Sequence, residues 1–112
     1  MKFKNMFSPI QIGPMTVKNR FVVPPMGNNF ANSDGTWSDE SVAYYGERAK
    51  GQFGLITIEA TVVHKGAKGG PKKPCLYDDN SIESLKKITD ACHEEGAKVS
   101  IQLQNAGPEG NA

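Results

Sequence analysis

The sequence predicts an α/β fold built on a parallel sheet. Runs rich in β-branched and apolar residues occur at 21–23, 55–63 and 99–103, and two stretches with helical spacing, 38–50 and 80–95, lie between them. Strands that alternate with helices across short joints are typical of parallel strands connected by right-handed crossovers. The 112 residues suffice for one domain, and the 12 glycines and 7 prolines indicate extensive turns and loops.

A β-hairpin is predicted before the first of these strands, over residues 8–19. Its apolar residues alternate with polar ones on both sides of Gly13-Pro14, a dipeptide typical of turns. The strand that follows, Phe21–Val23, is a continuous apolar run, which predicts burial on both of its faces. Pro24-Pro25 is expected to end this strand, because proline cannot donate a hydrogen bond to a neighbouring strand.

The first helix is predicted over Ser38–Lys50. Ser38 is a favourable N-cap residue, and Gly51 is expected to end the helix. A strand rich in β-branched residues is predicted next, over Leu55–Val63. The residues that recur at helical spacing, and so form the expected buried face of the helix, are Val42, Tyr45 and Ala49.

The second helix is predicted to begin at Asn80, its expected N-cap, with Glu83 at the capping-box position, and to end at Gly96. In the third strand, apolar and polar residues alternate, so the apolar ones are expected to face the helices and Gln102 the barrel interior. The apolar face of the helix is Ile82, Leu85, Ile88 and Cys92, and that of the strand is Val99, Ile101 and Leu103.

Three parallel strands and two helices do not close into a layered fold on their own. A closed (β/α)₈ barrel needs roughly 250 residues, so this chain could supply about three of eight strands and would leave two sheet edges open. Three arrangements stay open at this point: a fragment of such a barrel, a chain that borrows strands or oligomerises through its edges, and an open three-stranded sheet.

Composition argues against several classes of protein. The chain carries 13 basic and 12 acidic residues, a net charge of +1, which disfavours a nucleic-acid or membrane-surface binder. No apolar run approaches the roughly 20 residues that cross a bilayer. Cys75 and Cys92, without a secretory signal, are expected to be free thiols in the cytoplasm, and no metal-ligand spacing is present.

Ligands of parallel α/β folds bind at the carboxyl ends of the strands. Pro24–Gly27, Glu59–Thr61 and Gln102–Asn105 occupy those positions here. The prolines stiffen a backbone that could contact a planar ligand, and a flat heterocycle would satisfy the Gln102 carboxamide. From the residues alone, a plain loop and a partly exposed glutamine are the simpler interpretations.

A basic, glycine-rich segment follows the second strand, from His64 to Lys73. It lacks the Gly-Lys-Ser/Thr end of a P-loop and does not lead directly into a helix, which favours a solvated loop over a phosphate site. Contact with a phosphorylated substrate or cofactor stays open. His93 is expected to be exposed near the end of the second helix.

Several motifs occur together in an order that resembles the beginning of the old yellow enzyme-type NADH:flavin oxidoreductases, the family that includes the enoate reductases. The resemblance covers essentially the whole chain, and its strength lies in the order and spacing of the motifs. They are Met6–Ile10 with Thr16–Arg20, Val23–Gly27, Tyr44–Gly51 with Gly54–Ile56, and Ile101–Leu103 with Ala106-Gly107.

The resemblance implies an FMN-binding (β/α)₈ (TIM) barrel whose N-terminal hairpin closes the bottom, with residues 1–112 as one partial domain at its N-terminal end. It implies hydride transfer from NADH or NADPH through the flavin to the activated C=C bond of an enone or enoate. The residues that would contact the flavin, by matching position, are Pro24, Pro25, Met26, Gly27, Ala60 and Gln102.

The chain departs from the family pattern in two places. Gly27 stands where many relatives carry Thr or Cys. A glycine at this position is closer to the larger clostridial-type enoate reductases, which have additional iron–sulfur and flavin domains. Asn105–Pro108 stands where relatives often read His-Ala-Gly-Arg, which removes a ring and a cation from the edge of the site.

The substrate-anchoring pair, the proton-donating tyrosine and the phosphate loops of the family come later in the barrel, so no catalytic residue is assigned here. The isolated chain is expected to have little or no reductase activity. The alternative is a non-catalytic partial barrel that binds flavin weakly or only assembles with other chains.

Overall fold

The computed structural model of the chain describes residues 2–67 and 70–109. The predicted succession of hairpin, strand, helix, strand, helix and strand is confirmed. The elements are α1 (Lys4–Phe7), β1 (Ile10–Ile12), β2 (Met15–Val17), β3 (Val22–Val23), α2 (Asp39–Lys50), β4 (Leu55–Val62), the 3₁₀ turns η1 (Lys65–Ala67) and η2 (Asp79–Ser81), α3 (Ile82–Glu94), β5 (Lys98–Gln104) and the 3₁₀ turn η3 (Gly107–Glu109).

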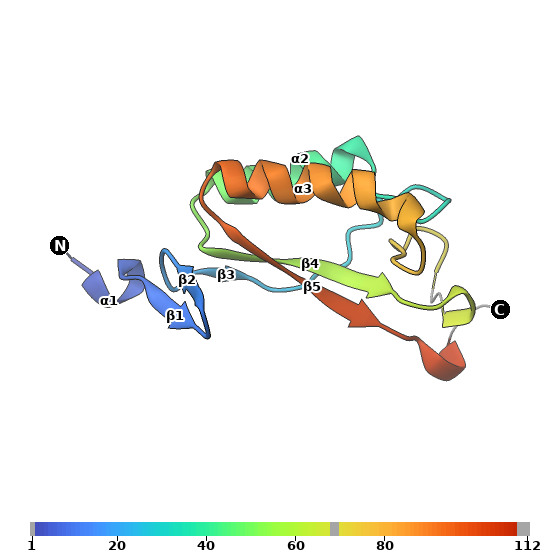
Figure 1. The fold of residues 1–112 in the computed structure, drawn as a ribbon, viewed down its shortest axis with the longest axis horizontal. Helices are drawn as coiled ribbons and strands as arrows, with labels where there is room; N and C mark the ends of the chain where they lie inside the picture. The colour runs from blue at the N-terminus through green and yellow to red at the C-terminus, as the bar shows by residue number, and fades with distance from the viewer. Residues whose placement is uncertain (1, 68–69, 110–112) are drawn as a thin grey trace.

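The main sheet has the order β3-β4-β5, and both pairings are parallel. Helices α2 and α3 lie side by side and cover one face of this sheet (Figure 1). Within the described residues no element covers the opposite face, and β3 and β5 form the two edges of the sheet. This is the open arrangement expected of a barrel that supplies only its first strands.

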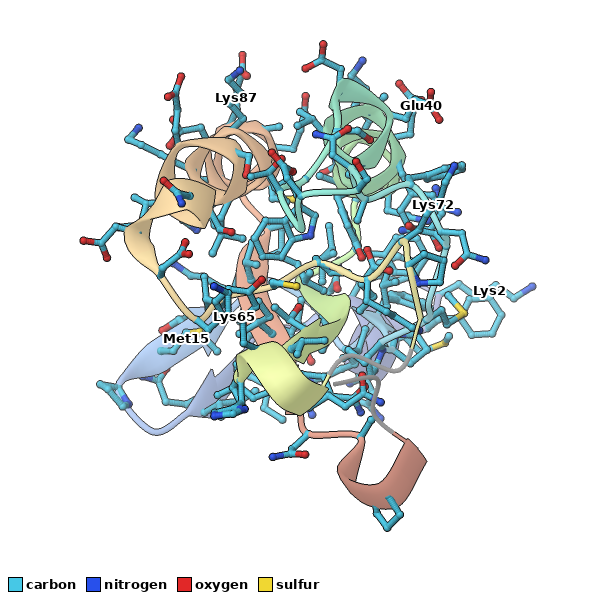
Figure 2. The ribbon with its side chains drawn as sticks, turned by 90° about the vertical axis from the view of Figure 1, so that its right-hand side faces the viewer. Lys2, Met15, Glu40, Lys65, Lys72 and Lys87 are labelled. Carbon is cyan, nitrogen blue, oxygen red and sulfur yellow. The ribbon has the colours of Figure 1, made fainter. Side chains whose placement is uncertain are left out.

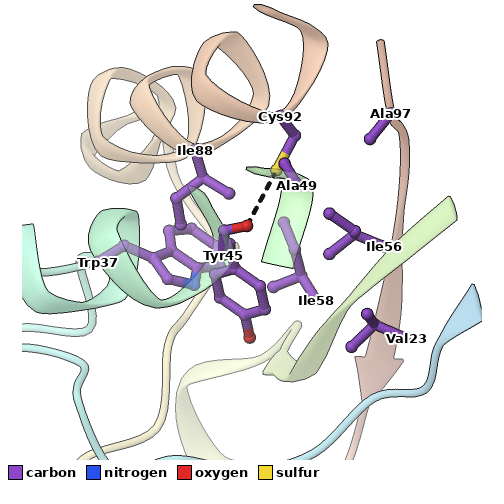
Figure 3. Packing of buried hydrophobic residues seen from close by; sticks show 9 residues of the cluster. All are labelled: Val23, Trp37, Tyr45, Ala49, Ile56, Ile58, Ile88, Cys92 and Ala97. Carbon is purple, nitrogen blue, oxygen red and sulfur yellow. Dashed lines mark hydrogen bonds between the residues drawn. The ribbon is translucent and has the colours of Figure 1, made fainter. Parts of the chain in front are cut away.

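A core of apolar side chains joins the helices to β4 (Figure 3). Ile56 and Ile58 are fully buried, and burial of each isoleucine stabilises the fold by about 1.5–3 kcal/mol. Their polar neighbour Thr57 points to the other face, where its hydroxyl lies 2.7 Å from that of Ser100. The buried residues contributed by the helices are Tyr45, Ala49, Ile88 and Cys92.

The hairpin predicted over residues 8–19 is present as the antiparallel pair β1–β2, and it lies at the amino ends of the parallel strands (Figure 1). The Asn19 carboxamide donates a 2.7 Å hydrogen bond to the carbonyl of Gln52, and Lys18 Nζ donates one of 2.7 Å to the carbonyl of Glu95. Two loops at this end of the barrel segment are therefore tied to the hairpin.

Three apolar residues expected to be buried are exposed instead. Val22, Ile82 and Leu103 are 49%, 55% and 60% exposed. Val22 lies on an edge strand, Leu103 near the end of the other edge strand, and Ile82 in the first turn of α3. Patterns of apolar residues report which positions suit burial, whereas burial itself requires a neighbouring layer that these residues lack here.

The start of the second helix differs from the prediction. The cap before α3 is Asp78, whose carboxylate accepts a 2.9 Å hydrogen bond from the N–H of Asn80, and the residues after it form the 3₁₀ turn η2. Helix α2 ends at Lys50 with Gly51 as its C-cap, as predicted, and the residue with left-handed backbone that follows is Gln52 (φ 73°). The predicted Ser38 cap of α2 and the Gly96 stop of α3 (φ 80°) are both present.

Candidate functional site

The three segments predicted to carry the site meet at the carboxyl ends of the parallel strands, and this end of the sheet is the edge at which the candidate site lies. Val23 pairs with Ile56, so the chain from Pro24 onward leaves the sheet alongside the second half of β4. The β4–β5 register has Ile58 opposite Ile101 and then Thr61 opposite Leu103. Gln102 therefore lies beside the Glu59–Ala60 segment.

The predicted flavin-contacting residues are accessible at this edge. Pro24, Met26, Gly27 and Gln102 are exposed, and Pro25 and Ala60 are half-buried. Gln102 follows Ser100 by two positions, so it shares the face opposite the helices, as predicted. It is exposed, because no described residue covers that face.

The polar groups at this edge fit a planar heterocycle that offers both donors and acceptors. Within the described residues, the Gln102 side chain has no hydrogen-bond partner. Nearby, Asn28 Nδ2 and Gln104 Oε1 are buried and also unpartnered among those residues. Buried polar atoms are costly unless bonded, so these groups suit a ligand with complementary atoms.

A bulge in β4 sets the orientation of Glu59, which the sequence placed in a candidate segment without indicating its burial. Between the two flanking pairs, β4 advances by three residues while β5 advances by two, so one extra residue is accommodated at Glu59–Ala60. The bulge turns Glu59 into the interior, where it is 1% exposed. A charged residue inside an otherwise uncharged strand was the signal that could have indicated this buried acid.

The Glu59 carboxyl group is held by hydrogen bonds from two other segments. Its Oε2 accepts a 3.2 Å bond from the N–H of Asn28, and its Oε1 accepts a 3.4 Å bond from the hydroxyl of Tyr45 in α2. That hydroxyl also accepts a 3.0 Å bond from the N–H of Glu59. Tyr45, predicted only as a packing residue, therefore also binds Glu59.

Burial raises the pKa of Glu59 above its ordinary value of 4.5, opposed by the hydrogen bonds from Asn28 and Tyr45 and by the nearby positive charge of Lys73. Burial likewise raises the pKa of the Tyr45 hydroxyl well above 10, so it acts as a neutral donor and acceptor. Lys73 lies close to the site: a Cβ atom on residue 27 would be 3.3 Å from its Nζ. Glycine at position 27 thus leaves room for this ammonium group.

The basic loop from His64 to Lys73 extends from the carboxyl end of β4. Figure 2 views the molecule from this end, with Lys65 and Lys72 labelled. His64 is exposed, and its Nδ1 accepts a 3.1 Å hydrogen bond from the N–H of Gly66. Lys68 and Gly69 lie outside the described residues, as do the last three residues of the segment 105–112.

The remaining residues considered from the sequence lie away from this edge or show no cluster. His93 is exposed on α3, and Cys75 and Cys92 are buried free thiols. Among residues 2–67 and 70–109, no three His, Cys, Asp or Glu side chains group as metal ligands would. In the same ranges no helix combines the length and hydrophobicity of a bilayer-crossing segment.

Known proteins share both the sequence pattern and the fold of this chain. Residues 5–112 match the family model described as the NADH:flavin oxidoreductase / NADH oxidase family. The match covers nearly the whole chain, from the first turn of α1 through the basic loop to the C-terminal end.

Three solved structures illustrate the similarity. The old yellow enzyme from Trypanosoma cruzi is 36% identical, with a TM-score of 0.89, over 98% of this chain and 29% of its own. A 2-naphthoyl-CoA reductase in complex with 2-naphthoyl-CoA is 33% identical, with a TM-score of 0.91, over 96% of this chain and 16% of its own. Morphinone reductase in complex with tetrahydroNAD is 28% identical, with a TM-score of 0.86, over 95% and 28%.

This chain therefore spans less than a third of each of these proteins, and its open α/β sheet matches the N-terminal part of the old yellow enzyme barrel. The family match over residues 5–112 and the shared fold at more than 30% identity lead to the same assignment. The chain belongs to the NADH:flavin oxidoreductase / NADH oxidase family, whose members are flavin-dependent oxidoreductases.

Proposed function

We propose that this chain is the flavin-binding beginning of an FMN-dependent oxidoreductase that passes hydride from NADH or NADPH to the activated C=C bond of an enone or enoate. The observation that carries the proposal is that Pro24–Gly27, Ala60 and Gln102 converge at the accessible carboxyl ends of the strands in a chain of this family. Residues 1–112 would form one partial barrel domain, completed by strands that are not part of this chain.

The residues of the chain would bind and orient the flavin. The Gln102 carboxamide, with a free donor and a free acceptor among the described residues, would bond the pyrimidine edge of the ring. The backbone from Pro25 to Gly27 would line the ring, and Ala60 would approach it with a side chain small enough to allow contact. Bound flavin supplies the hydride chemistry, and the protein sets its position and electrostatic surroundings.

The similar structures support the wider proposal. The structure of morphinone reductase is a complex with tetrahydroNAD, which supports a nicotinamide as reductant. The structure of the 2-naphthoyl-CoA reductase is a complex with 2-naphthoyl-CoA, which supports a small-molecule substrate. We propose that this protein likewise acts on a small-molecule substrate that carries a conjugated C=C bond. Free thiols at Cys75 and Cys92 suit a reducing compartment, so we place the protein in the cytoplasm.

Anaerobic stopped-flow measurements on the full-length protein that carries this chain test the proposal. Reconstituted with FMN, the protein should lose its flavin absorption on mixing with NADH or NADPH and regain it on mixing with 2-cyclohexenone. Gln102→Ala should weaken FMN binding by about tenfold, the loss expected for one or two hydrogen bonds. Glu47→Gln, a change of an exposed side chain on α2, is the control.

Failure of the flavin to respond to either nicotinamide would refute the redox proposal. A protein that binds FMN but reduces no C=C bond would instead support the alternative, a non-catalytic partial-barrel module. That alternative draws on the two open sheet edges, which suit assembly with other strands.

A further inference from the structure

Glu59 is a buried acidic residue for which the proposed flavin contacts provide no role. It is 1% exposed, and among the described residues no cation lies within ion-pair distance of it. Burial of an acid without a salt-bridge partner is costly, so its retention in the core calls for hydrogen bonds that use its acceptor oxygens.

Both oxygens of Glu59 are used, and they connect segments that are far apart in the sequence. Tyr45 from α2 donates to Oε1, and the backbone N–H of Asn28 donates to Oε2. Asn28 directly follows Gly27, at the end of the segment proposed to line the flavin. The carboxyl group thus joins the rigid strand–helix core to that loop.

The segment from Pro24 to Asn28 needs such a support because it has few hydrogen-bond donors and side chains that could fix its own conformation. Pro24 and Pro25 have no N–H to donate, and Gly27 has no side chain that could pack or bond. After residue 27, the Asn28 N–H is the first backbone group with a hydrogen bond to the core, and Phe30 N–H bonds only the Asn28 side chain.

We propose that Glu59 is a positioning residue that holds the Met26–Gly27–Asn28 backbone against β4, where this backbone would line the flavin. It would act through Asn28 without touching the cofactor, and Tyr45 would orient its carboxyl group. The proposal rests on the proposed flavin function and adds to it the means by which a glycine at position 27 can still present an ordered surface.

Two substitutions at this position separate positioning from general stability. Glu59→Met keeps the length of the side chain and removes both acceptors, and an apolar residue suits a buried site, so the fold should be retained. Glu59→Gln keeps one acceptor oxygen for the Asn28 N–H and presents its amide N–H to the Tyr45 hydroxyl, which can accept a second hydrogen bond. Glu47→Gln on the surface of α2 serves as the matched control.

The measurements are hydrogen–deuterium exchange, read by mass spectrometry on peptides covering residues 24–31 and 55–60, and the dissociation constant of FMN, both on the full-length protein. Glu59→Met should accelerate exchange in the first peptide alone and weaken FMN binding by about tenfold, the effect of losing one hydrogen bond to a carboxylate. Glu59→Gln should restore both values to within about threefold of the parent.

Unchanged exchange at residues 24–31 in Glu59→Met, or unchanged FMN affinity with the same flavin absorption spectrum, would overturn the proposal. Equal acceleration in both peptides would also overturn it, since Glu59 would then only support the fold. A parent protein that binds no FMN would refute the proposed function, whereas the exchange data would still decide whether Glu59 holds the loop.

Discussion

The Tyr45 hydroxyl joins α2 to β4 through two hydrogen bonds to Glu59. It donates to the Glu59 carboxyl group and accepts from the Glu59 N–H, so a single oxygen satisfies two buried groups of the bulge. Glu59 lies at the bulge, where it has no partner in the β4–β5 register, and its N–H bonds the Tyr45 hydroxyl. Tyr45 therefore compensates for a local irregularity of the sheet.

Tyr45→Phe should lower the free energy of unfolding by about 1–3 kcal/mol, because it leaves the buried Glu59 N–H without an acceptor. Urea denaturation followed by circular dichroism measures the change. Tyr44→Phe is the matched control, since no hydrogen bond joins the Tyr44 hydroxyl to any residue in the described ranges. Equal stability of the two variants would show that the Tyr45 hydroxyl is not needed by Glu59.

The pKa of Glu59 links stability to pH. Because burial raises it above 4.5, the folded chain retains a proton that the unfolded chain loses as pH rises from that value. The contribution of this group to stability is thus greatest below pH 4.5 and falls until pH passes the raised pKa. Glu59→Gln should remove this decline, so the difference in Tm between variant and parent should grow from pH 4 to pH 7. A constant difference would contradict the raised pKa.

The burial and orientation of individual residues could be predicted from the sequence where the strand or helix followed its regular period. The alternation of β5 placed Gln102 on the face opposite the helices, and the helical spacing of α2 identified Tyr45 and Ala49 as buried. Glu59 escaped this reasoning because the bulge breaks the period of two, so the interior of β4 takes up consecutive residues, Ile58 and Glu59. The only local signal of this bulge in the sequence is the glutamate itself.

At the scale of elements, the amino ends of the strands are held by a close approach of the hairpin to the start of β4. A Cβ atom on residue 54 would lie 2.7 Å from Val17 Cγ1, 2.6 Å from Asn19 Oδ1 and 3.0 Å from the Asn19 carbonyl. Only glycine fits there. The same region carries the Asn19–Gln52 and Lys18–Glu95 hydrogen bonds, so the hairpin closes this end of the segment.

Gly54→Ala should therefore destabilise the chain by about 1–3 kcal/mol through overpacking against backbone and buried side chains. Gly46→Ala provides a control of opposite sign: its Cβ would make an ordinary 3.8 Å contact with Ala91, and alanine favours a helix interior by about 0.5–1 kcal/mol. Thermal denaturation of both variants tests the pair. A tolerated alanine at position 54 would contradict the close hairpin contact.

The predicted elements matched the structure best where local signals were strong. The Ser38 cap fixed the start of α2 and Gly96 the end of α3, whereas Asn80 was misassigned because Asp78, two residues earlier, caps a 3₁₀ turn first. Burial was overestimated for Val22 and Leu103 because the sequence specifies surfaces for a complete barrel. Among the described residues no neighbouring layer covers them.

For the molecule as a whole, the open sheet limits what the chain can do by itself. It spans 16% to 29% of the related proteins described above, and its two edge strands have one neighbour each among the described residues. Open edges of this kind favour pairing with other strands, from the rest of a barrel or from a second chain. The shape, 53 × 27 × 23 Å, is elongated by the hairpin that projects from one end (Figure 1).

The isolated 112-residue chain should show no NADH-dependent reduction of 2-cyclohexenone above the rate of free FMN, because later strands of the barrel carry the phosphate-binding loops. The loss of NADH absorbance with purified chain and added FMN measures this. Size-exclusion chromatography with light scattering, run alongside, should detect association through the sheet edges. Turnover above the free-flavin rate would show that the first strands suffice for catalysis.

Residues 24–27, 60 and 102 are proposed to form part of a flavin site. The most direct measurement is the visible absorption spectrum of the full-length protein that carries this chain, after free FMN has been removed by gel filtration. We predict a retained flavin band, and a much smaller one for Gln102→Ala at equal protein concentration and equal helix content. A colourless parent protein, or a variant that retains as much flavin as the parent, would contradict it.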